Sequence, residues 1–114
     1  MNILAKFLRG VAKLRFKALG HATIKDIPTD EFNALVDNLV SSGWRKVSEY
    51  SGLDAWIDYG RIEIRKDSIK LTLEWDNWTQ GSIEGPRDTL EALAARDSKL
   101  TVTDEWRWSE YGQQ

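Results

Sequence analysis

Apolar residues recur with a helical period early in the chain and predict a helix over residues 3–19. Asn2 can cap its start, and Gly20 can end it. One side of this helix is apolar (Ile3, Leu4, Phe7, Leu8, Val11, Leu14 and Ala18), and the other holds Lys6, Arg9, Gly10, Lys13 and Lys17. Leu8, Ala12, Phe16 and Leu19 widen the apolar arc beyond what one flat sheet covers, so we expect a second packing partner for this helix.

A second helix is predicted from Thr29 to the residue before Gly43. Thr29 is the expected N-cap, and Asp30 and Glu31 place negative charge in the first turn, where the helix dipole favours it. Its apolar positions follow the i, i+3, i+4, i+7 rule: Phe32, Leu35, Val36, Leu39 and Val40.

Three strands are predicted next, over residues 44–50, 55–66 and 69–78. The last two form a hairpin if Asp67 and Ser68 are its turn. The register then pairs Ile64 with Leu71, Ile62 with Leu73, Glu63 with Thr72 and Arg61 with Glu74. Apolar side chains meet on one face and polar ones on the other, as a half-buried sheet requires.

The remaining pattern predicts a loop around Ile83, a helix over 86–97, a strand over 99–108 and a frayed tail at 110–114. Asp88 and Glu91 have the spacing of a capping box for that helix. The order is ααβββαβ. It predicts one α+β domain over residues 1–114, with an antiparallel sheet of about four strands and two to three helices on one face.

Composition is typical of a globular protein, with 41% apolar and 30% charged residues among 114. There is no cysteine, which excludes disulfides and thiolate chemistry and favours a reducing, cytoplasmic location. Lys6 and Arg9 interrupt the first apolar run, so a signal peptide is not expected, although a transit peptide stays open. His21 alone cannot supply a usual zinc site and suits a loop or capping role, so we expect no metal or cofactor.

Charge is unevenly distributed along the chain. Residues 1–25 carry six bases and no acid, whereas residues 26–114 carry ten bases and eighteen acids, a net charge of −8. The basic helix allows three interpretations: a core helix with a solvated outer face, which the sequence favours, a helix on an anionic membrane surface, or a helix on nucleic acid phosphates. The acidic remainder argues against nucleic acid. The wide apolar arc makes a homodimer through this helix a further arrangement to test.

Six tryptophans are more than a small core needs, and indoles suit ligand stacking and interface hot spots. Trp78 and Trp108 lie near strand ends beside polar residues and are expected to be exposed, Trp106 shares a face with Trp108, and Trp75 continues the inward row of its strand. Glu74 and Asp76 alternate outward and, with Asp58 and Glu63, would form an acidic, aromatic-edged surface. The competing interpretation, which the sequence favours, is a solvated face whose acids pair with Arg61, Arg65 and Lys70.

These residues support a non-catalytic interaction domain that binds a basic protein partner through Glu74, Trp75, Asp76, Trp78, Trp106 and Trp108. Small bacterial inhibitors of toxins work in this general way, which is an analogy only. The alternative is a carbohydrate or small-ligand binder that uses the same indoles. A carboxylate-based hydrolase comes third, because eighteen acids provide a suitably spaced pair by chance. Binding is favoured over catalysis, since no catalytic motif is present.

Overall fold

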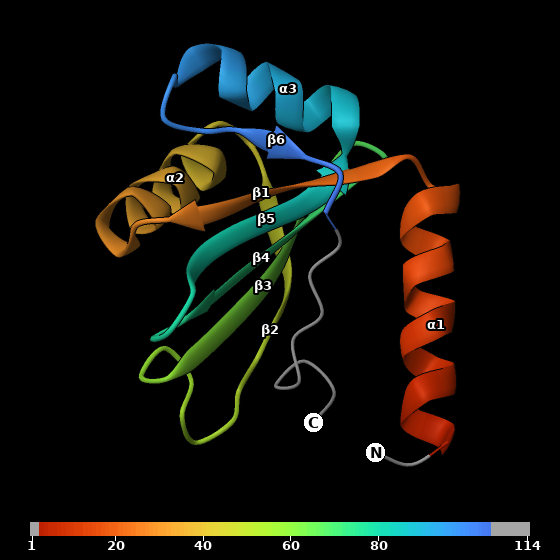
Figure 1. Cartoon of the computed structure of the whole chain (residues 1–114). Helices are drawn as coiled ribbons and strands as arrows, with labels where there is room; N and C mark the ends of the chain where they lie inside the picture. The colour runs from red at the N-terminus through yellow and green to blue at the C-terminus, as the bar shows by residue number, and fades with distance from the viewer. Residues whose placement is uncertain (1–2, 106–114) are drawn as a thin grey trace.

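The computed structural model describes residues 3–105 (of Ala5, the backbone only), and they form an α+β fold (Figure 1). The elements run in the order α1 (Ile3–Ala18), β1 (His21–Ile27), α2 (Thr29–Ser41), β2 (Arg45–Glu49), β3 (Tyr59–Lys66), β4 (Ile69–Asp76), β5 (Gln80–Pro86), α3 (Arg87–Arg96) and β6 (Val102–Thr103). The six strands make one antiparallel sheet in the order β2-β3-β4-β5-β1-β6. Within these residues no helix is long and apolar enough to cross a bilayer.

The hairpin of β3 and β4 has the predicted register. Ile64 lies opposite Leu71 and Ile62 opposite Leu73, all buried, while Glu63 faces Thr72 and Arg61 faces Glu74. Asp67 forms the turn in the left-handed region at φ 56°. The local alternation of polar and apolar residues was therefore enough to align these two strands.

The prediction of about four strands was too low, and β1 and β5 are the strands it missed. Strand β1 loses its alternation where Asp26 adopts φ 57° and the pairing with β5 shifts register. Strand β5 has the composition of a loop because its neighbours leave room only for glycine. A Cβ on Gly81 would come closer than 3.0 Å to the Phe32 ring, and one on Gly85 equally close to Leu71.

Helices α2 and α3 cover one face of the sheet and enclose a single core cluster (Figure 1). Phe32 and Leu39 from α2 and Leu90 from α3 pack there against the inward side chains of the strands, Trp75 among them. Helix α1 does not join this layer. It stands beside the sheet and contacts the body at the start of β1, where the Phe16 ring meets the His21 ring edge-on at 6.2 Å between centroids (Figure 1).

Two predicted helix caps were wrong. Helix α2 has Pro28 as its N-cap, and Thr29 uses its hydroxyl differently: it donates to Gln80 Oε1 at 2.7 Å and accepts from Trp75 Nε1 at 2.9 Å. Helix α3 has Pro86 as its N-cap with no side-chain cap, so the Asp88 capping box does not form. In each case a proline fixes the entry of the chain without a side-chain acceptor.

The predicted last strand is reduced to Val102–Thr103 in the described residues, and its end at 106–108 lies outside them.

Candidate functional site

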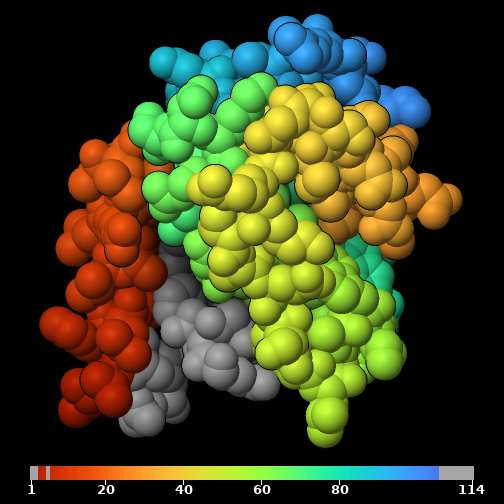
Figure 2. Space-filling model, turned by 180° about the vertical axis from the view of Figure 1, so that it is seen from behind, coloured from red at the N-terminus to blue at the C-terminus, as the bar shows by residue number. Residues whose placement is uncertain are grey.

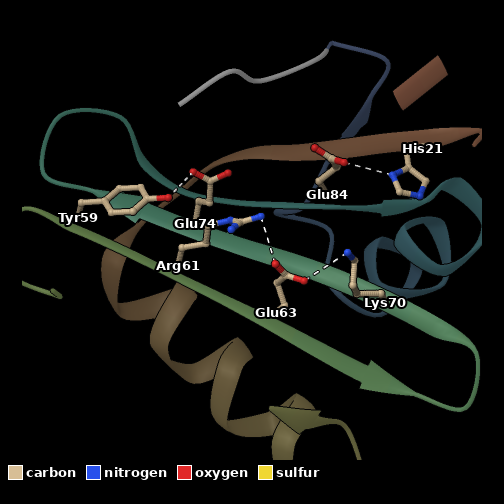
Figure 3. Close-up of polar contacts among 7 residues, drawn as sticks. All are labelled: His21, Tyr59, Arg61, Glu63, Lys70, Glu74 and Glu84. Carbon is tan, nitrogen blue, oxygen red and sulfur yellow. Dashed lines mark hydrogen bonds and ion pairs between the residues drawn. The ribbon is translucent and has the colours of Figure 1, made fainter. Parts of the chain in front are cut away.

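The sheet face opposite α2 and α3 carries the carboxylates that the sequence placed outward. Strand alternation brings Glu63, Glu74 and Glu84 to this face from β3, β4 and β5 (Figure 3). Each of the three carboxylates meets a donor from a neighbouring strand or from its own strand (Figure 3). We call this surface the polar sheet face.

Glu63 lies at the centre of an ion-pair cluster. Its two oxygens lie 3.3 Å from Arg61 Nη2 and 3.2 Å from Lys70 Nζ. Burial raises the pKa of Glu63, but the hydrogen bond and charge of Lys70, the charge of Arg61 and a hydrogen bond from Ser48 lower it by more. The net effect holds the pKa of Glu63 below its ordinary value, so the carboxylate stays charged and paired.

The other two carboxylates are bound by neutral or titratable donors. Tyr59, which is fully buried, donates its hydroxyl to Glu74 Oε2 at 2.9 Å, and its ring packs edge-on against Tyr50 at 4.9 Å. His21 Nδ1 lies 3.1 Å from Glu84 Oε2 (Figure 3). The polar sheet face therefore resembles the solvated, internally paired surface that the sequence favoured, with little acidic charge left unmatched.

The predicted binding residues separate in space. Trp75 lies in the core, as its inward row predicted, and is 9% exposed. Asp76 is 6% exposed and holds the turn after β4, because it accepts hydrogen bonds from the backbone of Trp78 and Thr79 and from the Thr79 hydroxyl. Trp78 is 65% exposed, as predicted. Trp106 and Trp108 lie outside the described residues.

Exposed apolar side chains lie instead on the loop 50–58 and the turn 77–79, two segments that contact each other. Leu53, Ile57 and Trp78 are 103%, 66% and 65% exposed, and we call these three residues the aromatic loop end. Asn77 joins the two segments: its amide donates to the carbonyl of Ile57 and to Asp58 Oδ1, both at 2.7 Å. Both segments lie at the same end of the sheet (Figure 1), and the loop 50–58 projects there in Figure 2.

The loop 50–58 is held by its own hydrogen bonds. Tyr50 donates its hydroxyl to Asp54 Oδ1 at 2.6 Å, and the carbonyl of Asp54 accepts from the backbone of Ile57 and Asp58. Trp56 adopts φ 62°, a conformation that non-glycine residues rarely take, and its backbone N–H donates to the carbonyl of Tyr59. The Leu53 and Ile57 side chains are thus presented to solvent on an ordered backbone.

The two chain segments that hold the aromatic loop end are acidic in sequence, although Lys46 pairs with Glu49 and His21 with Glu84. Residues 47–60 and 71–86 together contain six acids and no Lys or Arg. The acids are Glu49, Asp54, Asp58, Glu74, Asp76 and Glu84. The sequence signal for this surface was present but missed: Leu53 and Ile57 are large apolar residues inside a segment of turn-forming residues.

A pocket of about 350 Å³ opens between Trp56 of this loop, helix α2 and strands β2 and β3. Phe32, Val36, Ile62 and Trp56 form its apolar wall, and Asn33, Asp37, Lys46 and Glu49 its polar rim. Trp56 Nε1 donates to Glu49 Oε2 at 2.7 Å, and this bond, followed by the hydrogen bond from Lys46, lowers the pKa of Glu49. The pocket therefore combines an indole edge with a charged carboxylate.

Over residues 3–105 no group of three or more histidine or acidic side chains is arranged to hold a metal ion. No family model, curated relative or solved structure matches the chain.

Proposed function

We propose that this protein is a non-catalytic interaction module that binds a basic protein partner through the aromatic loop end. The observation that carries the proposal is the exposure of Leu53, Ile57 and Trp78 on a hydrogen-bonded backbone within acidic segments. Indole and large aliphatic side chains supply most of the energy in protein interfaces. Because the loop is already ordered, little conformational entropy is lost when a partner binds.

Charge favours a basic partner. Glu49 pairs with Lys46 and Glu84 with His21, and Asp76 is bound within its own turn. Asp54, Asp58 and Glu74 are bound by neutral donors instead, so their charge would attract a cationic surface. The polar sheet face is a weaker candidate, since Glu63 is already bound by Arg61 and Lys70. We therefore assign binding to the loop end, where Trp78 retains its proposed role and Asp76 positions it.

Site-specific photo-crosslinking in cells that produce this protein tests the assignment. A benzophenone amino acid at Ile57 is expected to give a discrete adduct with a basic protein. The same group at Ala92, an exposed position on α3, serves as the matched control and should give none. Trp78→Ala should reduce the Ile57 adduct at least tenfold, because hot-spot indoles contribute about 2 kcal/mol or more. Equal adducts from Ile57 and Ala92, or an adduct that W78A leaves intact, would refute the proposal.

A second candidate is binding of a carbohydrate or another small polar ligand in the pocket beside Trp56. Its apolar wall and the Glu49 and Asp37 carboxylates match the way sugars are bound, with a ring packed on apolar surface and hydroxyls held by acids. Titration of a monosaccharide panel against the indole N–H resonances tests it. A ligand in the pocket shifts the Trp56 resonance and leaves that of Trp78 in place. No shift with any sugar would remove this candidate.

A further inference from the structure

Helix α1 leaves its apolar stripe in solvent. The six large side chains on this side of the helix are 47–87% exposed: Ile3, Leu4, Phe7, Leu8, Val11 and Leu14. Phe16, by contrast, is 4% exposed where the helix meets His21. Val11 and Phe16 are five residues apart and therefore point about 140° apart around the helix axis. The stripe therefore lies on a different side of the helix from the Phe16 contact and is exposed, which differs from the core helix that the sequence favoured.

All the charged residues of α1 are basic. Its five basic side chains are exposed, and residues 1–25 contain no Asp or Glu: the bases of the helix are Lys6, Arg9, Lys13, Arg15 and Lys17. Helix α1 runs along one side of the molecule, red in Figure 2. The acidic part of the protein follows the helix in the sequence: residues 26–114 have a net charge of −8.

We propose that α1 lies on the surface of an anionic lipid bilayer, with its apolar stripe at the boundary of headgroups and acyl chains. An exposed apolar stripe flanked only by Lys and Arg is the usual signature of a helix in this position. The helix is about 24 Å long at 1.5 Å per residue, so the whole stripe can lie in the membrane plane. Because α1 contacts the body through Phe16, about 140° around the helix axis from Val11, the stripe can face a bilayer without the body lying between them.

A second copy of this chain is a less suitable partner for α1 than anionic lipid. Two α1 helices packed stripe to stripe would bury the apolar side chains but leave Lys6, Arg9, Lys13 and Lys17 of each helix on the outer side, without an anionic partner on either helix. Nucleic acid would neutralise the lysines but leave Phe7 and Val11 in water. Anionic lipid is the partner that accommodates both the charge and the apolar side chains.

Vesicle flotation of the full chain tests this proposal. Wild-type protein should float with vesicles of phosphatidylcholine containing about 30% phosphatidylglycerol at low salt, and not with phosphatidylcholine alone. Added salt at about 0.5 M should release much of it. The double variant Phe7→Ser, Val11→Ser should lower the partition coefficient at least about tenfold. The matched control Val40→Ser, Val47→Ser removes two similarly exposed side chains, 45% and 44%, outside α1 and should float like wild type.

Three results would overturn the proposal. The first is wild-type protein that stays unbound with anionic vesicles at low salt. The second is a stripe variant that floats as well as wild type while the circular dichroism of both is the same. The third is a wild-type dimer in sedimentation equilibrium that F7S/V11S converts to a monomer, which would assign the stripe to a second copy. The aromatic loop end is not altered by these variants, so its crosslinking test remains independent.

Discussion

Replacing Gly60 by Ala is expected to lower the free energy of unfolding by about 2 kcal/mol, because the added methyl group would occupy the position of the Trp56 ring. The new Cβ would come closer than 3.0 Å to three atoms of the indole. The ring cannot move freely, since Trp56 Nε1 donates to Glu49 at 2.7 Å and the Trp56 backbone N–H donates to Tyr59 at 2.7 Å. The strand geometry of Gly60 itself accepts alanine, so the cost comes from the indole.

The magnitude follows from what the displaced ring loses. An exposed hydrogen bond to a carboxylate is worth about 1 kcal/mol. Trp56 is 37% exposed, and losing roughly 70 Å² of buried apolar contact costs about 2 kcal/mol at 25 cal/mol per Å². Alanine offsets part of this loss, because it costs about 0.5–1 kcal/mol less conformational entropy than glycine when it is ordered in a strand. The sum is about 2 kcal/mol, or a melting temperature about 8 °C lower.

A double-mutant cycle separates this effect from any other consequence of the substitution. Urea unfolding followed by far-ultraviolet circular dichroism gives the free energies for wild type, Gly60→Ala, Trp56→Ala and the double variant. In the Trp56→Ala background, G60A should cost nothing or stabilise slightly, so the coupling energy is about 2 kcal/mol. If G60A has the same effect in both backgrounds within about 0.5 kcal/mol, the indole does not lie over Gly60 and the loop geometry described above is wrong.

Thr23→Val should raise the free energy of unfolding by about 1 kcal/mol, because the Thr23 hydroxyl is buried without a hydrogen-bond partner among residues 3–105, whereas Thr23→Ser should lower it. A T23V variant less stable than wild type in urea would show that this hydroxyl is bonded. The pKa of Glu63 is lower in the folded state than in the unfolded state. Its ion pairs therefore stabilise the fold at pH values above the unfolded-state pKa, and this stabilisation is lost as the pH falls through the folded-state pKa. The deficit of Glu63→Gln should therefore shrink between about pH 7 and about pH 3, and a constant deficit would contradict the pairing.

The sequence predicted those parts of the fold whose partners are close along the chain. The register of β3 and β4 and the inward position of Trp75 follow from alternation, because side chains on successive residues point to opposite faces. Helices α1 and α2 follow from the helical period in the same way. Strand β5 could not be found like this, since Gly81 and Gly85 signal a loop until Phe32 and Leu71 are known to lie against them.

The candidate surfaces also depended on the tertiary structure, because exposure is decided by contacts between residues that are distant in the sequence. The sequence established that α1 is amphipathic and basic, and it predicted an exposed indole at Trp78 near the end of a strand. Only the packing of the whole chain decided that the body covers the Phe16 side of α1 and leaves the stripe exposed. It also brought Ile57 beside Asn77, twenty residues away. Amphipathicity is a local property of one element, whereas exposure depends on what every other element leaves uncovered.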